Sequence, residues 1–67
     1  MKLFTISEVA KILRTNPASV YELVHAGFLP AMKLGQYKVR EESLERFLAE
    51  CEGKDFSDLS NVKNLTA

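Results

Sequence analysis

The chain has 67 residues and a mass of 7.5 kDa, a length that accommodates one small domain with one hydrophobic core. Its 46% apolar and 27% charged residues are typical of a folded globular protein and exclude a disordered or collagen-like chain. The net charge is zero, but residues 1–40 hold six basic and two acidic residues, whereas residues 41–67 hold three basic and seven acidic residues. The first 40 residues are therefore the part expected to face a polyanion.

The same composition limits the chemistry. The single cysteine, Cys51, cannot form an internal disulfide, and with one histidine, His25, it cannot complete a four-ligand zinc site. So small a domain leaves little room for a catalytic cleft, so we expect no enzymatic activity, metal or cofactor. No stretch resembles a signal peptide or approaches the roughly 18 apolar residues of a membrane span. We therefore expect no membrane partner and a bacterial or phage-type cytoplasm as the compartment.

A first helix is predicted to begin after Thr5. The spacing of Thr5 and Glu8 is that of a capping box, in which each side chain bonds the backbone N–H of the other residue. Apolar residues then recur at the interval of one helix face, at Ile6, Val9, Ala10 and Leu13. The helix is predicted to end near Arg14.

A second helix is predicted to begin at Pro17, because Asn16 is a good N-cap and proline suits the first helical position. Gly27 suits the left-handed turn that ends it. Its core stripe is Val20, Leu23 and Val24. The opposite face carries Ala18, Glu22 and His25, flanked by Ser19 and Tyr21.

A β-hairpin is predicted over residues 32–40, with Gly35-Gln36 as a two-residue type II′ turn. That turn pairs Lys33 with Lys38, so that Lys33, Lys38 and Arg40 share a basic face, and Met32, Leu34, Tyr37 and Val39 share an apolar face. The two facing lysines would repel unless an anion lay between them, although two side chains extended into water would cost little.

A third helix is predicted to follow, with Glu41, Glu42 and Glu45 in its first turn and Gly53 at its end. Its core stripe is Leu44, Phe47, Leu48 and Cys51. We therefore expect a domain over 1–53 and a tail over 54–67. The tail has apolar residues every three positions, at Phe56, Leu59, Val62 and Leu65, loosely compatible with a short helix. Two alternatives stay open: docking on the domain, or disorder awaiting a partner.

The predicted fold is mainly α with a small β-hairpin, in the layout of a winged helix-turn-helix with three helices and a wing. Residues 3–50 also resemble the excisionase-like DNA-binding family, compact relatives of the MerR-type regulators. The matching segments are residues 4–10, 19–24, 27–31 and 42–48, together with Gly35 at the hairpin tip. The resemblance implies that the second helix enters a major groove and that the wing contacts neighbouring backbone or minor groove.

Carried onto this sequence, the resemblance gives Ala18, Ser19, Tyr21, Glu22 and His25 as groove contacts and Lys33, Lys38 and Arg40 as wing contacts. For His25 and Glu22, a solvated side chain is an equal or better interpretation than a base contact. The resemblance further implies an architectural protein that binds double-stranded DNA in several copies, bends it, and helps an integrase to excise a mobile element. The alternatives are a small transcriptional regulator of a phage or mobile element, and a protein-interaction module such as an antitoxin.

Overall fold

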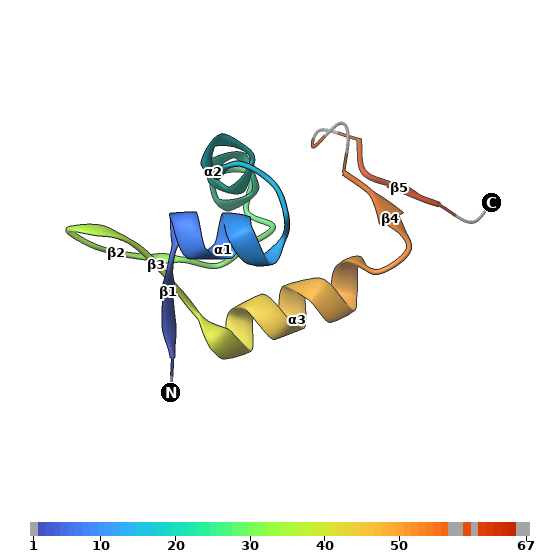
Figure 1. Ribbon diagram of the computed structural model, residues 1–67. Coiled ribbons are helices and arrows are strands. Elements are labelled where there is room, and N and C mark those ends of the chain that lie inside the picture. Colours follow the sequence, from blue (N-terminus) through green and yellow to red (C-terminus); the bar gives the residue numbers. More distant parts are fainter. Residues whose placement is uncertain (1, 57–58, 60, 66–67) are drawn as a thin grey trace.

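The computed structural model describes residues 2–56, 59 and 61–65, which form three helices and two small antiparallel sheets (Figure 1). In chain order the elements are β1 (Leu3–Thr5), α1 (Ile6–Ile12), α2 (Pro17–His25), β2 (Met32–Leu34), β3 (Gln36–Arg40), α3 (Glu41–Cys51), β4 (Lys54–Asp55) and β5 (Lys63–Asn64). This is a compact helix-turn-helix type of fold. In the described part of the chain, no helix has the length and apolarity needed to cross a bilayer.

The capping box predicted for α1 is confirmed. The Thr5 N–H donates to Glu8 Oε1 at 2.8 Å, and the Glu8 N–H donates to Thr5 Oγ1 at 3.2 Å. These bonds satisfy backbone donors that the first helical turn leaves without partners. After Ile12 the chain leaves the helix through Arg14, whose φ of 56° lies in the left-handed region.

The predicted start and core stripe of α2 are also confirmed. Asn16 Oδ1 accepts from the Ser19 N–H at 2.8 Å, and Pro17 occupies the first helical position. Val20 is fully buried, and Leu23 and Val24 pack against the core. The short connection from α1 fixes the angle between the two helices, which are directly in contact.

The hairpin has a different register from the predicted one. Leu34 pairs with Gln36 and Lys33 with Tyr37, so the chain reverses about Gly35, whose φ is +74°. Glycine adopts this conformation without steric cost, so one residue makes the turn where two were predicted. A shift of one residue moves a strand's side chains to the other face of the sheet. The prediction of one basic face and one apolar face is therefore wrong.

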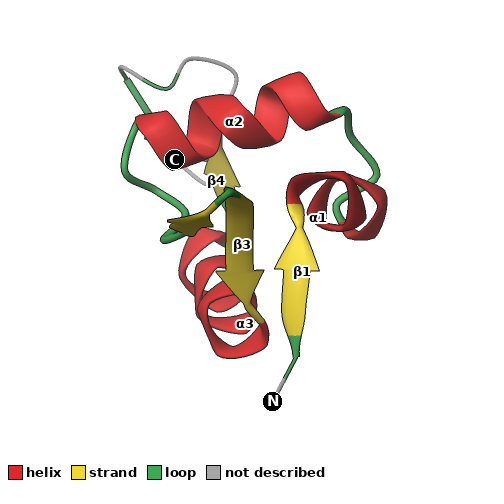
Figure 2. Cartoon of the chain, turned by 90° about the vertical axis from the view of Figure 1, so that its left-hand side faces the viewer, coloured by secondary structure: helices red, strands yellow, loops and turns green. Residues whose placement is uncertain are grey.

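The strand β1 was not predicted, because three residues are too few for a periodic signal. It lies beside β3 and runs antiparallel to it (Figure 2), which gives the strand order β1-β3-β2. Phe4 lies opposite Val39, and both point toward the helices.

The core is formed by α1, α2, β3 and α3 together with the loop after α2. Its buried residues are Ile6, Val9, Ala10, Val20, Leu29, Val39, Leu44 and Phe47. Leu48, predicted to belong to this core, is 41% exposed, and that prediction is wrong. At 100° per residue, Leu48 lies about 70° from the centre of the stripe formed by Leu44, Phe47 and Cys51. Because α3 packs on the core only along this stripe, the Leu48 side chain stays exposed.

The described tail residues form the strands β4 and β5 in place of the loosely predicted helix. Phe56 packs on the core, with its ring centroid 5.2 Å from that of Phe28 and 5.9 Å from that of Phe47. The Leu65 N–H donates to the Gly53 carbonyl at 2.6 Å. The start of the tail thus docks on the domain, while residues 57, 58, 60, 66 and 67 lie outside the described part.

Candidate nucleic-acid interface

Three aromatic rings join the outer side of α2 to the hairpin. Tyr21 and His25, one helical turn apart, lie nearly parallel, with centroids 6.3 Å apart and planes at 19°. The Tyr37 ring stands edge-on to both, at 5.7 Å from Tyr21 and 6.0 Å from His25. Edge-to-face contacts between aromatic rings contribute about 0.5–1.5 kcal/mol each in general. These contacts connect the hairpin to the outer side of α2.

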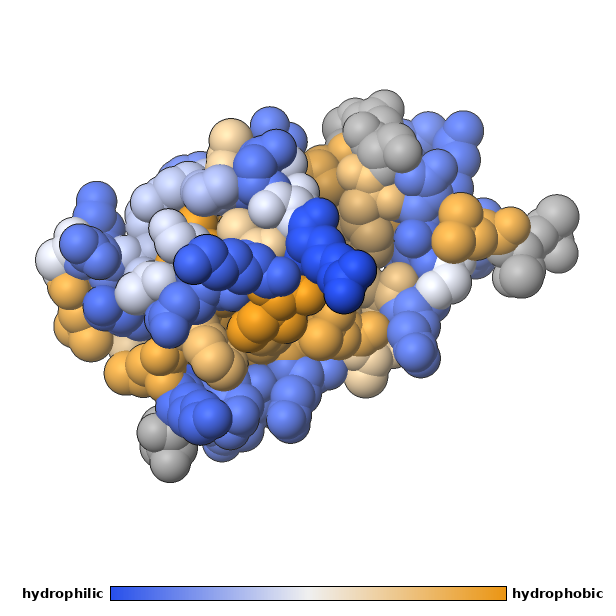
Figure 3. Space-filling view, in the orientation of Figure 1, coloured by the Kyte–Doolittle hydropathy of each residue, from blue (hydrophilic) through white to orange (hydrophobic). Residues whose placement is uncertain are grey.

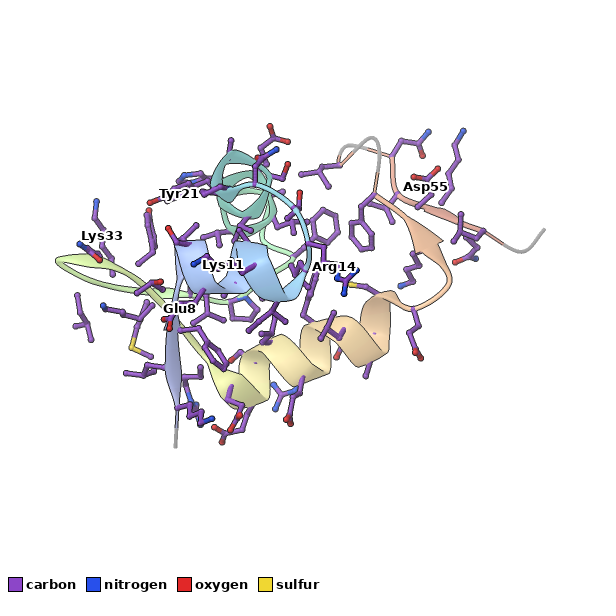
Figure 4. All side chains as sticks on the ribbon, viewed as in Figure 1. Glu8, Lys11, Arg14, Tyr21, Lys33 and Asp55 are labelled. Atoms are coloured by element: carbon purple, nitrogen blue, oxygen red, sulfur yellow. The ribbon has the colours of Figure 1, made fainter. Side chains whose placement is uncertain are left out.

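Lys33 extends this aromatic cluster along the hairpin. Its Nζ lies over the Tyr37 ring, 5.4 Å from the centroid, because the observed register places both residues on the side of the sheet that faces α2. Among the described residues, no carboxylate forms an ion pair with Lys33. Figure 4 shows Lys33 on the hairpin and Tyr21 on α2 on the same side of the molecule. This positive charge is therefore available to a ligand.

A hollow of about 440 Å³ lies between the hairpin, α2 and the start of α1, and we call it the hairpin hollow. It is lined by Thr5, Ile6, Ser7, Tyr21, Lys33, Gly35, Gln36 and Tyr37. The polar residues that line it carry hydroxyls, an amide or an ammonium, and none of the lining residues carries a carboxylate. Such a set suits a phosphate oxygen, since hydrogen bonds from charged donors are the stronger ones.

Lys38 and Arg40 lie on the other side of the sheet, away from α2. Arg40 Nη2 donates to Glu42 Oε2 at 2.8 Å, which partly neutralises its charge. The pKa of Glu8 is lowered first by the hydrogen bonds from Thr5 and to a smaller extent by the nearby charge of Lys38. The predicted pairing of Lys33 with Lys38 is wrong, because Lys33 lies opposite Tyr37 and Lys38 lies opposite Met32.

The predicted groove residues of α2 divide between its two sides. Ala18, Tyr21, Glu22 and His25 are exposed, and Ser19 is half-buried. Tyr21 and His25 lie toward the hairpin. Ser19 and Glu22 line a second hollow, whose other residues are Leu13, Thr15, Leu23, Phe47, Phe56 and Leu59. The structure thus brings Tyr21 and His25 together with Lys33 and separates them from Ser19 and Glu22.

Three further polar residues line the hairpin hollow without any signal in the sequence that predicts a site there, namely Thr5, Ser7 and Gln36. Thr5 was assigned only to the helix cap, and Gln36 only to the turn. Since β1 went unrecognised, nothing in the sequence placed the start of α1 beside the hairpin. The strand order β1-β3-β2 places the start of α1 beside the hairpin, and this brings the three residues to one hollow.

Cys51 is half-buried on α3, and burial is the main cause that raises the pKa of its thiol. A raised thiol pKa lowers the fraction of reactive thiolate, which fits a packing role. In the residues that the structure describes, no three His, Cys, Asp or Glu side chains gather closely enough to hold a metal ion.

Comparison with known proteins gives a family match. Residues 3–52 match the helix-turn-helix domain family. A protein of Bacillus subtilis (strain 168), named "Uncharacterized protein YvgK", is 42% identical over 45 residues, which cover 66% of this chain and 15% of that protein. A protein of Mycobacterium tuberculosis (strain ATCC 25618 / H37Rv), named "Putative DNA-binding protein Rv0500A", is 38% identical over 48 residues, which cover 70% of this chain and 62% of that protein.

The chain spans less than two thirds of the length of these curated relatives. No solved structure matches it significantly. The matched region runs from β1 to α3 and so includes every element that builds the aromatic cluster and the hairpin hollow.

Proposed function

This chain belongs to the helix-turn-helix domain family, and we propose that it binds double-stranded DNA. In this proposal α2 enters the major groove and the hairpin lies along the adjacent backbone. The name of the Mycobacterium tuberculosis relative, which describes that protein as DNA-binding, supports it. The proposal assigns no catalytic step and no cofactor to the chain.

The observation that carries the proposal is the placement of Lys33, which forms no ion pair with any described residue, beside exposed α2 side chains. Lys33 and the hydroxyls of the hairpin hollow bind one backbone phosphate, which sets the position of the protein on the duplex. From α2, Tyr21, His25 and Ala18 face the base edges. Ser19 and Glu22 lie at the margin of this contact, on the side of the second hollow.

Lys38 and Arg40 take no direct part in this contact. They lie on the sheet face opposite to α2, and Arg40 is paired with Glu42. A rigid duplex that touches α2 and Lys33 does not reach that face. The proposed wing contact is therefore narrower than the resemblance implied, with Lys33 as its main cation.

The finer role we propose is that of an excisionase-type architectural protein, which bends DNA beside a mobile element and assists an integrase. The family resemblance over residues 3–50 supports it. A contact with few cations also fits, because neighbouring copies or an integrase would add the binding free energy that one copy lacks. A small phage or mobile-element regulator would use the same contact without bending the DNA.

Fluorescence anisotropy with a random-sequence duplex, over a series of salt concentrations, tests the DNA contact. Binding that weakens as salt rises is expected, because phosphate contacts release counterions from the duplex. Absence of binding at about 50 mM salt, where such contacts are strongest, would contradict it. Resonance energy transfer between the ends of a labelled attachment site then tests bending, and an unchanged end-to-end distance on binding would favour the regulator.

A further inference from the structure

The second hollow, on the tail side of α2, touches the proposed DNA contact only at its margin. It measures about 440 Å³ and lies where the turn after α1, the helix α2, the helix α3 and the tail come together. Figure 3 shows hydrophobic atoms in this region, between the helical part of the molecule and the tail strands. Small organic molecules bind in hollows of this size, so the second hollow has room for one.

Apolar side chains form most of the wall of the second hollow. Phe47 is buried, whereas four others are half-buried and leave part of their apolar surface uncovered, namely Leu13, Leu23, Phe56 and Leu59. The rings of Phe47 and Phe56 are tilted at 52° with their centroids 5.9 Å apart. A further ring placed beside them extends this aromatic contact and removes apolar surface from water. The wall therefore favours a ligand with an apolar, and preferably aromatic, body.

The polar part of the second hollow is negatively charged. Thr15 and Ser19 contribute hydroxyls, and Glu22 is the charged residue among the described residues that line it. Glu22 is exposed, and it forms no ion pair with any described residue. Carboxylate and hydroxyl oxygens accept hydrogen bonds, and an ammonium group supplies three donors. The second hollow thus suits a cation, whereas the hairpin hollow, with Lys33 in its lining, suits an anion.

We propose that the second hollow binds an organic cation, a small molecule with an aromatic body and one protonated amine. The body packs on the apolar wall, and the amine donates to the Glu22 carboxylate and to a neighbouring hydroxyl. Charge complementarity selects this occupant, because Glu22 repels an anion and forms no charge-assisted pair with a neutral molecule. The site lies at the edge of the proposed DNA contact, and its occupancy requires no DNA.

Chemical-shift titration of the ¹⁵N-labelled chain, without DNA, tests the proposal. Three probes share a phenylpropyl body and differ in the head group, namely 3-phenylpropylamine, 3-phenylpropan-1-ol and 3-phenylpropionate. The amine is expected to shift the amide signals of the residues that line the second hollow. Its dissociation constant should be about 1–5 mM, in keeping with a ligand of about ten non-hydrogen atoms. The alcohol should bind about fivefold more weakly, and the carboxylate more weakly still.

Two variants separate the roles of the charge and of the apolar wall. Glu22→Gln keeps the shape of the side chain, and it should lower the affinity for the amine to that for the alcohol, about fivefold, without changing the affinity for the alcohol. Glu45→Gln is the matched control, because Glu45 is an exposed glutamate of α3 that does not line the hollow. Leu59→Ala removes part of the apolar wall, so it should weaken binding of the amine and of the alcohol alike.

The comparison of the three probes on the native chain tests the proposal independently of any variant. Absence of saturable shifts up to about 20 mM amine overturns it, since a site of the expected affinity would then be mostly filled. Shifts centred outside the second hollow, or equal affinities for the amine and the alcohol, also overturn it. So does a preference for the amine that survives in Glu22→Gln. Unchanged circular dichroism of each variant excludes misfolding as the cause of lost binding.

Discussion

At the scale of single residues, the two lysines of the hairpin are close in the sequence but lie on opposite sides of the sheet. Lys33 lies over Tyr37 on the α2 side of the sheet, and Lys38 lies on the side of the sheet that points away from α2. Their different surroundings follow from one turn residue, Gly35, whose positive φ fixes the pairing of the two strands. We therefore expect Lys33 and Lys38 to differ in their contribution to DNA binding, although both carry one positive charge.

The carboxylate of Glu8 gives a pH-dependent contribution to stability. Its pKa lies below the ordinary value of 4.5, first because the Thr5 backbone N–H donates to it. A lowered folded-state pKa stabilises the protein above the unfolded-state pKa, and this contribution is lost as pH falls through the folded-state value. In Glu8→Gln, which keeps the shape of the cap, the melting temperature should fall at pH 7 and match that of the native chain at strongly acid pH. Equal melting temperatures at every pH would contradict this role.

Sequence preference should depend on His25 more than on Ser19. His25 is exposed beside Tyr21, whereas Ser19 is half-buried and lines the second hollow. Binding-site selection from random duplexes should therefore give an altered motif for His25→Ala, since base contacts carry sequence information. Ser19→Ala is expected to select nearly the native motif. The reverse result would place the reading surface on the tail side of α2.

At the scale of elements, the helices were predicted well and the sheet was not. The cap at Thr5 and the pair Asn16-Pro17 are local signals, so α1 and α2 begin where the sequence indicates. Strand register depends on contacts between strands and on one turn conformation, neither of which alternation of residue types determines. The site predicted on α2 and the hairpin stays a prediction, and of its three wing cations only Lys33 lies on the side of the sheet that faces α2.

The α3 helix allows a direct test of its packing. Phe47 is 8% exposed and contacts Phe56, whereas Leu48, the next residue, is 41% exposed. Phe47→Ala should lower the free energy of unfolding by about 3–5 kcal/mol. Leu48→Ala should change it by no more than about 0.5 kcal/mol, as for other surface substitutions. Chemical denaturation of both variants measures this, and equal losses would show that α3 packs in a different rotation.

At the scale of the whole molecule, charge is divided between the basic first 40 residues and the acidic remainder of the chain. The basic first 40 residues contain α2 and Lys33, and the acidic remainder contains α3 and the tail. The tail is joined to the core through Phe56, which contacts rings from both Phe28 and Phe47. The part of the tail that the structure describes therefore contributes to the stability of the domain.

Truncation after Gly53 tests that contribution. Loss of Phe56 exposes the rings of Phe28 and Phe47, so the melting temperature should drop by several degrees, as expected for a loss of about 1–2 kcal/mol in a small domain. Phe56→Ala in the full chain should reproduce most of the drop. A truncated chain as stable as the native one would show that the tail is independent of the domain.

The central claim is that this helix-turn-helix domain contacts DNA with α2 and the Lys33 side of the hairpin. Its most direct test is the salt dependence of duplex binding by Lys33→Gln and Lys38→Gln, two variants with the same loss of charge. Each phosphate contact contributes about 0.9 to the slope of log K against log salt. The account predicts that the slope shrinks by about 1 for Lys33→Gln and stays unchanged for Lys38→Gln. A reduced slope for Lys38→Gln, with the native slope for Lys33→Gln, would place the DNA on the side of the sheet that points away from α2 and contradict the account.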